Sequence, residues 1–396
     1  MKKFFYKLTA IIIAVIMLLP IGLQVFGEEN DHTSEANPFG FADGSLNLNC
    51  KSAILMEATT GTILYSQNAE EALPPASVTK VMTLLLIMEA IDAGTIRVDD
   101  TVSVSANAAS MGGSQVFLKE GEQMTVEDLL KSVVIASAND AAVALAEYVS
   151  GSVDAFVAKM NAKAEKLGMK STKFENVTGL DDTAENHLTS AKDIALMSCA
   201  LVAHPLILQY SSIWMDSIRD GAFGLTNTNR LVRFYRGCTG LKTGSTSKAG
   251  FCISATAERE GLSLVCVIMG AESRDIRNAA ATTLLDWGFA NFALFKEDCG
   301  VSQPISVKGS GKKEIAGSYP SFSCVVRREE VAKIEKIVTL SEYIIAPTPT
   351  GEKIGEVAFK CGEKTIGTVD ICTEAEIKRI TFFEILYQIF AKSLLI

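Results

Sequence analysis

The stretch Pro74–Thr83, "PPASVTKVMT", places a serine and a lysine three residues apart, behind two prolines and ahead of an apolar run. The prolines end any extended segment, and residues from Ser77 to about Ala93 are apolar on most sides, which predicts a buried helix. Positions i and i+3 share a helix face, so Ser77 and Lys80 should be neighbours. Two interpretations are open at this point: Ser77 is a helix N-cap, or it is a nucleophile with Lys80 as its base.

A lysine can act as a base only where burial or a nearby cation lowers its pKa to about 7 to 8. The apolar helix predicted around Lys80 offers such burial. Ser-x-x-Lys alone decides nothing, because the chain contains it three times, at Ser77/Lys80, Ser245/Lys248 and Ser310/Lys313. Only the first pair lies at a predicted helix start, so the interpretation depends on its partners elsewhere in the chain.

Two further motifs follow in the sequence. Ser137-Ala138-Asn139 lies in a break between two helical segments, 60 residues after Ser77, and Lys242-Thr243-Gly244 lies on a strand-like run that continues to Ser245. Taken singly, Asn139 is better explained as a helix cap or turn residue, and Lys-Thr-Gly is unremarkable as a surface turn. A strand edge with a cation, a hydroxyl and a glycine that permits close approach suits an extended peptide ending in a carboxylate.

Hydrophobic periodicity predicts the organisation of the chain. A hairpin (52–57 and 62–66), a helical middle (126–134, 140–148 and 153–167), strands (241–244, 251–257 and 262–270) and a helix (276–292) predict an α/β (α+β) domain with helices on an antiparallel sheet. We expect this domain to span residues 47–296. Short Val- and Ile-rich runs between Gly and Pro turns predict a small all-β domain over residues 297–373.

The two ends of the chain differ from the rest. Lysines followed by an apolar run and small residues predict a secretory signal peptide over residues 1–27, with a retained N-terminal anchor as the alternative, and residues 28–46 are expected to be a linker. In residues 374–396 polar residues recur every three or four positions and leave a broad apolar face, which predicts an amphipathic helix at a membrane surface; packing on the β domain is the alternative. Removal of residues 1–27 takes away three lysines and changes the net charge from −9 to −12. A chain with this negative charge is a poor candidate for binding nucleic acid.

The cysteines and histidines predict no metal site. The nine cysteines are an odd number without a Cys-x-x-Cys pair, so neither a disulfide framework nor zinc is indicated. Cys252 and Cys266 lie in apolar runs and are expected in the core. Three histidines leave few candidates for a His-based triad. No cofactor is expected.

The three motifs, in this order and on these elements, resemble the D-alanyl-D-alanine carboxypeptidases, the low-molecular-mass penicillin-binding proteins. The resemblance covers most of the chain outside residues 1–27. It includes "SANDAAVALAE" from Ser137, "FENVTGLDD" from Phe174, "HLTSAKDIA" from His187 and "GLKTGSTSKAGFCISATA" from Gly240. It implies the fold of the penicillin-recognising serine transpeptidases, followed by the β domain and a C-terminal helix that holds the enzyme on the outer face of the cytoplasmic membrane.

The resemblance also implies a role for each site residue. Ser77 would be the acylated nucleophile, Lys80 its general base, Ser137 a proton relay and Asn139 the residue that holds the substrate amide. Lys242, Thr243, Gly244 and Ser245 would bind the substrate, with its carboxylate on Lys242 and Thr243 and the oxyanion on the backbone N–H groups of Ser77 and Ser245. Arg277 would lie near the carboxylate, although Arg274 is close enough in sequence to be mistaken for it. The segment before Lys-Thr-Gly departs from the family, with Cys238 and Thr239 where Val and Asp are more usual.

The implied reaction removes the terminal D-alanine from a peptidoglycan stem pentapeptide ending in D-Ala-D-Ala, with β-lactams as inhibitors. Three alternatives remain at this point. A DD-endopeptidase would cut cross-links with the same residues. A β-lactamase would need fast deacylation, and no Glu-x-x-Leu-Asn segment supplies the glutamate used by one large class. A non-catalytic wall-binding protein would be expected only if a catalytic residue were missing.

Overall fold

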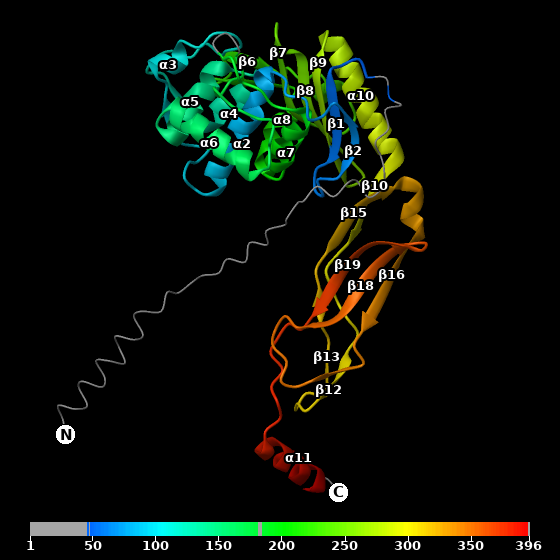
Figure 1. The fold of residues 1–396 in the computed structure, drawn as a ribbon. Coiled ribbons are helices and arrows are strands. Elements are labelled where there is room, and N and C mark those ends of the chain that lie inside the picture. The colour runs from blue at the N-terminus through cyan, green and yellow to red at the C-terminus, as the bar shows by residue number, and fades with distance from the viewer. Residues whose placement is uncertain (1–45, 47, 181–183, 395–396) are drawn as a thin grey trace, which may run out of the picture. The chain divides into compact units, whose positions relative to one another are not determined.

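The computed structural model describes residues 46, 48–180 and 184–394. The predicted signal peptide and almost all of the predicted linker lie outside these residues. The centre of the fold is a five-stranded antiparallel sheet with the strand order β2-β1-β9-β8-β7 (Figure 1). Its strands are β1 (Ser52–Glu57), β2 (Ile63–Gln67), β7 (Cys238–Thr246), β8 (Gly250–Arg259) and β9 (Leu262–Ala271). The predicted antiparallel sheet is therefore confirmed, and β7, which carries Lys-Thr-Gly, forms one edge.

Helices cover both faces of this sheet. Helix α10 packs against β8 and β9 on one face, and the helical middle of the chain, through α7, packs against β1 and β9 on the other (Figure 1). The helices are α2 (Lys80–Asp92), α3 (Ala106–Ala109), α4 (Val126–Ile135), α5 (Asn139–Ser150), α6 (Val153–Lys166), α7 (Ala191–Val202), α8 (Pro205–Ser211), α9 (Leu231–Phe234) and α10 (Arg274–Asn291). The α-helical middle that the periodicity predicted is confirmed.

The start of the predicted Ser77–Ala93 helix differs from the prediction. Residues Ala76–Thr79 form a 3₁₀ turn, η1, and the α-helix α2 begins only at Lys80. The N-cap of α2 is Thr79, and no side chain caps either helix start, so the interpretation of Ser77 as an N-cap is wrong. Because a 3₁₀ turn has three residues per turn, positions i and i+3 lie almost above one another. The side chains of Ser77 and Lys80 therefore point in more nearly the same direction than they would in an α-helix.

Two short hairpin-like pairs flank the helical block. Strands β3 (Thr101–Ser103) and β4 (Gln123–Thr125) bracket a long connection that includes α3. Strands β5 (Met215–Ile218) and β6 (Phe223–Thr226) form a hairpin whose buried side chains, Ile218 and Leu225, join the main core. The buried Cys252 also belongs to that core, and Cys266 is fully buried on β9, as predicted.

The C-terminal region is β-rich, as predicted. Its first strand, β10 (Phe292–Glu297), begins five residues before the predicted boundary at residue 297 and pairs with β15. Its core holds a stacked pair of rings, Phe322 and Phe359, with centroids 4.6 Å apart. The remaining elements are β11 (Gly300–Val301), β12 (Ile305–Lys308), β13 (Glu314–Ile315), β14 (Ser318–Tyr319), β15 (Phe322–Arg327), η2 (Arg328–Lys333), β16 (Ile334–Leu340), β17 (Tyr343–Ile345), β18 (Lys353–Cys361) and β19 (Lys364–Cys372).

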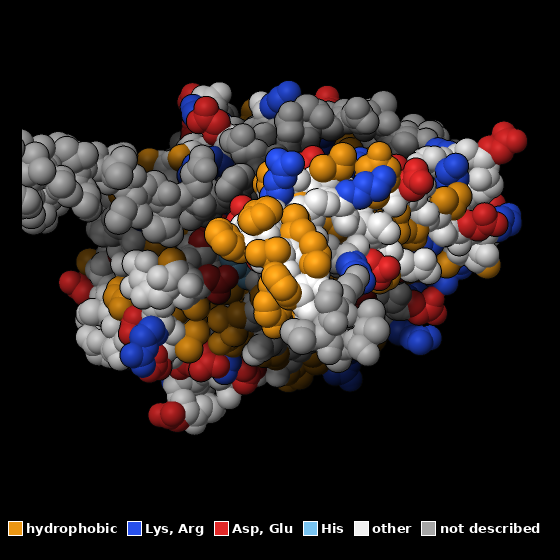
Figure 2. All heavy atoms as spheres, turned by 90° about the horizontal axis from the view of Figure 1, so that it is seen from below, with side chains coloured by type: hydrophobic (Ala, Val, Ile, Leu, Met, Phe, Trp, Pro, Cys, Tyr) orange, Lys and Arg blue, Asp and Glu red, His pale blue; other side chains and the backbone are white. Residues whose placement is uncertain are grey.

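The last helix is shorter than predicted. Helix α11 spans Phe382–Leu394, whereas a helix from residue 374 was expected. Ile377, assigned to the apolar face of that helix, instead pairs with Thr348 through backbone hydrogen bonds and is buried. Seven large apolar side chains of α11, from Phe382 to Phe390, are exposed. They gather in the foreground of Figure 2, which views the molecule from below.

Helix length and composition bear on a membrane span. Across the described ranges, no single helix is both long and apolar enough to cross a bilayer. Two pairs of helices that are bent relative to each other, α5 with α6 and α7 with α8, are together long and apolar enough, by length and composition alone.

Candidate active site

Ser77 and Lys80 meet at the start of α2. The Nζ atom of Lys80 lies 3.0 Å from Ser77 Oγ, 2.6 Å from Asn139 Oδ1 and 2.8 Å from the carbonyl oxygen of Thr178. Lys80 is fully buried, whereas Ser77 is half-buried and so open to a reactant. Asn139 Oδ1 and the Thr178 carbonyl can only accept hydrogen bonds, so they occupy two N–H groups of Lys80 and leave its third direction toward Ser77.

The charge on Lys80 is disfavoured by its surroundings. Burial lowers the pKa of Lys80 well below its usual value, and the nearby cation of Lys242 lowers it further, while the Asp140 carboxylate acts in the opposite direction. Removing an ammonium group from water costs free energy that a neutral amine does not pay. Lys80 therefore has both burial and a neighbouring cation, either of which can make a lysine a base.

In the described part of the chain, the side chain of Asn139 is hydrogen-bonded, whereas that of Ser137 is not. Asn139 is the first residue of α5, but its side chain does not cap the helix; Nδ2 donates to the Gly112 carbonyl at 2.7 Å while Oδ1 faces Lys80. Ser137 is buried in a left-handed backbone conformation (φ 64°), and within the described residues its Oγ has no hydrogen-bond partner. A strained residue with an unsatisfied hydroxyl, two positions before Asn139, is typical of a functional site.

Strand β7 brings the Lys-Thr-Gly motif to the same cluster. Lys242 is buried, and its Nζ donates to the Thr243 carbonyl at 2.9 Å. Burial, followed by the Arg277 guanidinium, lowers the pKa of Lys242 to about 7. Thr243 Oγ1 lies 2.8 Å from the hydroxyl of Thr228, an exposed residue just after β6. The motif is thus a buried strand segment and not a surface turn.

Two glycines let the backbone around Ser77 fit between its neighbours. A Cβ atom on Gly244 would lie 2.7 Å from the Ser77 nitrogen and 2.9 Å from that of Val78. A Cβ atom on Gly179 would lie 1.8 Å from the Ala76 carbonyl oxygen, and Gly179 also has a positive φ of 81°. Only glycine allows both approaches. They hold η1 between β7 and the 176–180 segment.

The two remaining predicted residues, Ser245 and Arg277, make no side-chain hydrogen bond to Ser77 or Lys80. The Ser245 side chain is exposed at the end of the motif. Arg277, on α10, is buried and its Nη1 donates to the Cys252 carbonyl at 3.4 Å, whereas Arg274 is exposed. Burial, followed by Arg274, lowers the pKa of Arg277 to about 10. Arg277 makes no hydrogen bond to Lys242 or Thr243, and it acts on Lys242 through its charge.

Some residues of the site were not predicted. The Thr178 carbonyl and the Thr228 hydroxyl contact Lys80 and Thr243 directly, and Asp140 binds the backbone N–H groups of Val116 and Leu118. A backbone carbonyl leaves no sequence signal. The polar run Asn227-Thr228-Asn229, 14 residues ahead of the Lys-Thr-Gly motif, was visible, but it reads as a loop in the sequence. Among the described residues no group of three His, Cys, Asp or Glu side chains is arranged to hold a metal ion.

A half-buried serine beside a buried lysine, facing an edge strand with Lys-Thr-Gly on an antiparallel sheet covered by helices, defines the penicillin-recognising class of serine hydrolases. The family model described as "D-alanyl-D-alanine carboxypeptidase" (Peptidase_S11) matches residues 38–273, and "Penicillin-binding protein 5, C-terminal domain" matches residues 289–379. The chain belongs to the serine-type D-alanyl-D-alanine carboxypeptidase family.

Individual relatives agree with this family. The chain is 38% identical to D-alanyl-D-alanine carboxypeptidase DacF of Bacillus subtilis, over 96% of this chain and 97% of that protein. It is similar to the crystal structure of penicillin binding protein 5 from Haemophilus influenzae, with a TM-score of 0.74, 28% identity, and coverage of 85% of this chain and 100% of that one. It is also 31% identical to a D-alanyl-D-alanine endopeptidase of Pseudomonas aeruginosa, over 60% of this chain and 76% of that protein.

Proposed function

We propose that this chain removes the terminal D-alanine from peptidoglycan stem pentapeptides through an acyl-enzyme on Ser77. The observation that carries the proposal is the position of the Lys80 amine, between two carbonyl-type acceptors and Ser77 Oγ. In the neutral amine, two N–H groups point at those acceptors and the lone pair points at Ser77. Lys80 can therefore accept the serine proton when Oγ attacks.

The proposed reaction has two halves. Ser77 Oγ adds to the carbonyl of the penultimate D-alanine, Lys80 takes the hydroxyl proton, and the C–N bond to the last residue breaks as its nitrogen gains a proton. Ser137, whose buried hydroxyl is unsatisfied, is the proposed relay for that proton. Water then hydrolyses the ester and frees Ser77. The backbone N–H groups of Ser77 and Ser245 would stabilise the oxyanion in both halves, and such a donor contributes about 3 to 4 kcal/mol.

Substrate binding is assigned to β7 and the residues around it. Lys242, Thr243 and the charge of Arg277 would bind the terminal carboxylate, and Gly244 lets the strand approach Ser77. Asn139 would hold the peptide amide. β-Lactams would enter as cyclic mimics of the same acyl donor.

D-Alanine release and penicillin labelling together test the proposed function. We expect the purified protein to release D-alanine from a pentapeptide and to carry a stable penicillin adduct on Ser77, located by mass spectrometry of its peptides. The Ser77→Ala protein should show neither. An adduct on another residue, or D-alanine release by Ser77→Ala, would remove the nucleophile assignment, and rapid turnover of the adduct would favour a β-lactamase.

The proposal includes a place in the cell. We propose that residues 1–27 direct export, that residues 47–296 and 297–373 form the catalytic and β domains, and that α11 holds the enzyme on the outer face of the cytoplasmic membrane. Seven large apolar side chains of α11 are more than a third exposed, namely Phe382, Phe383, Ile385, Leu386, Tyr387, Ile389 and Phe390. A helix with such a surface lies well at a lipid–water interface.

A charge placed on α11 should weaken this attachment. Phe383 is 79% exposed, and Phe383→Asp should lower binding to vesicles of phosphatidylcholine and phosphatidylglycerol by about tenfold or more, because one buried aromatic side chain contributes roughly 1.5–3 kcal/mol. Co-sedimentation measures the change. Ile345→Asp is the matched control, since Ile345 is 63% exposed but lies on β17. Equal losses in both variants would contradict the anchor.

A further inference from the structure

The connection that runs from Gly112 to Glu122, here called the 112–122 loop, is attached to the site at its first residues. The Gly112 carbonyl accepts a hydrogen bond from Asn139 Nδ2, and the Ser114 carbonyl accepts one from the Asn139 backbone N–H at 2.7 Å. Asp140 then binds the N–H groups of Val116 and Leu118 at 3.1 and 3.0 Å. Hydrogen bonds therefore tie the loop to Asn139 and Asp140, the first two residues of α5.

The β5–β6 hairpin is attached to the other side of the site. The chain leaves β6 and reaches Thr228 within two residues, and Thr228 hydrogen-bonds to Thr243. Asn229 Nδ2 also donates to the Gly240 carbonyl on β7 at 2.8 Å. At its base the hairpin is held to α4 by the ion pair between Asp216 and Lys131. The hairpin tip extends away from these fixed points.

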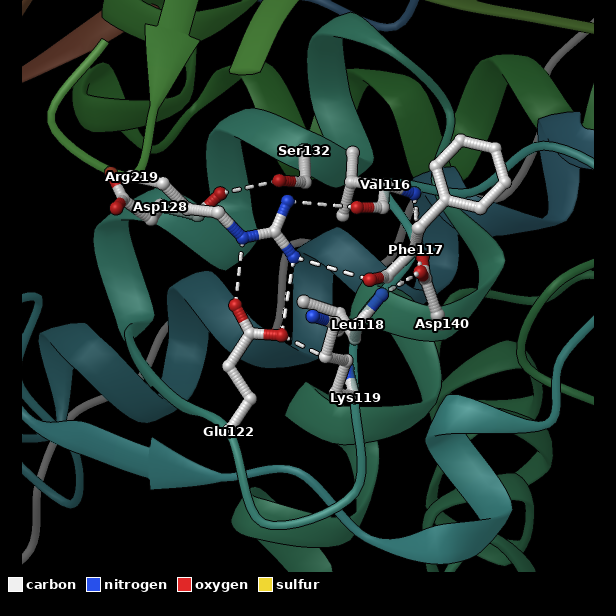
Figure 3. A network of polar contacts seen from close by, with 9 residues as sticks. All are labelled: Val116, Phe117, Leu118, Lys119, Glu122, Asp128, Ser132, Asp140 and Arg219. Atoms are coloured by element: carbon white, nitrogen blue, oxygen red, sulfur yellow. Dashed lines mark hydrogen bonds and ion pairs between the residues drawn. The ribbon is translucent and has the colours of Figure 1, made fainter. Parts of the chain in front are cut away.

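The loop and the hairpin tip meet through Arg219, as Figure 3 shows. Its guanidinium donates two hydrogen bonds to the Glu122 carboxylate, at 2.7 and 3.2 Å, and further ones to the carbonyls of Val116 at 2.9 Å and Phe117 at 3.4 Å. The hydrogen bond from Arg219 also lowers the pKa of the Glu122 carboxyl. A forked, charge-assisted contact of this kind is specific to arginine.

Aromatic side chains complete the contact. Phe117 lies edge-on to Phe223 of β6 with ring centroids 6.3 Å apart, and the Arg219 guanidinium carbon lies 5.5 Å from the centre of the Phe223 ring. Phe117 is 63% exposed although both its neighbours are buried. Phe117, Arg219 and Asp220 all have positive φ values, of 58°, 56° and 52°. Non-glycine residues keep this conformation only where the surroundings hold it.

We infer that Arg219 joins the 112–122 loop to the β5–β6 hairpin as a wall on the leaving-residue side of the site, and so restricts the enzyme to a single small leaving residue. The inference rests on the proposed function, in which Thr243 binds the carboxylate of the leaving D-alanine and Asn139 holds the donor amide. A cross-linked substrate carries a second stem peptide in place of that D-alanine. It would have to displace the joined loop and hairpin, whereas the pentapeptide would not.

The test compares two substrates on the same protein without residues 1–27. For each variant, the rate of cleavage of a cross-linked stem-peptide dimer is divided by the rate of D-alanine release from the pentapeptide. Arg219→Ala and Phe117→Ala should raise this ratio by roughly tenfold or more, a size typical of pocket discrimination. Arg219→Lys should raise it less, because it keeps the charge but not the fork. Arg233→Ala, on α9 beside Trp214 and Phe234, is the matched control and should leave the ratio unchanged.

Penicillin acylation of Ser77 and the midpoint of thermal unfolding are measured on every variant. A ratio that stays constant while Ser77 is still acylated would overturn the inference. So would a wild-type protein that cleaves the dimer as fast as the pentapeptide, and that result would leave the carboxypeptidase proposal standing. A wild-type protein with neither D-alanine release nor an adduct would overturn the proposed function, and the inference with it. If Arg219→Ala does not fold, Phe117→Ala decides, because the Phe117 ring is mostly exposed and its loss leaves the buried core intact.

Discussion

Replacing Lys80 with methionine is expected to lower the rate of Ser77 acylation by on the order of 10²- to 10⁴-fold, the usual contribution of a general base. Methionine has nearly the same length and fills the buried space around Lys80, so the fold should persist. The Asn139 and Thr178 oxygens would lose their donor, at a cost of roughly 1–3 kcal/mol of stability. The second-order rate constant for penicillin acylation, measured by quenched mass spectrometry, gives the effect.

The pH dependence of the acylation rate distinguishes the role of Lys80 from that of Lys242, the other buried lysine of the site. Lys80 must be neutral to accept a proton, so the acylation rate should rise as pH passes its lowered pKa. Lys242 must be charged to bind a carboxylate, so the rate should fall as pH rises through about 7. Lys80→Met should lose the rising limb, whereas Lys242→Met should lose the falling limb and keep the rising one. A rising limb that survives in Lys80→Met would contradict its role as the base.

Gly244→Ala is expected to reduce acylation about 100-fold, as a displacement of reacting groups by about 1 Å typically does. The added methyl carbon would lie 2.7 Å from the Ser77 nitrogen, closer than carbon and nitrogen atoms approach, so β7 and η1 must separate. The separation would move Thr243 and the Ser245 backbone away from Ser77. Penicillin acylation and D-alanine release should fall together, because both use the same groups.

A second glycine variant controls for the change of residue type. Gly311 has an ordinary φ and nothing within 4 Å of its Cβ position, so Gly311→Ala should leave acylation unchanged. A Gly244→Ala protein that reacts with penicillin at the wild-type rate would show that the close approach of β7 to Ser77 is not needed.

The elements with strong periodicity could be predicted from the sequence. The hairpin of β1 and β2, the helices α4 to α6 and the strands β7 to β9 all lie within a few residues of their predicted positions. The three motifs were also enough to select Ser77, Lys80, Asn139 and Lys242 as a set, and the structure brings these residues to one cluster.

Other features depend on contacts that a sequence does not display. The 3₁₀ turn at Ser77 exists because η1 is held between Gly179 and Gly244, which come from segments more than 100 residues away. Helix α11 begins at Phe382 because a backbone pairing between Thr348 and Ile377 keeps the preceding residues out of the helix. Arg219 was not singled out, since a charged residue in a turn carries no signal until its partners Glu122 and Val116 are known.

The strand order of the central sheet has a consequence for how the chain folds. Strand β1 pairs with β9, and Ser52 lies opposite Met269, over 200 residues later in the chain. During synthesis β1 is complete long before its partner exists, while the helices between them make local contacts and can form early. All six residues of β1 are buried in the finished sheet, and until β9 exists β1 has only β2 beside it. The order of appearance thus leaves one edge of β1 unpaired, and open to pairing with another chain, until β9 has been made.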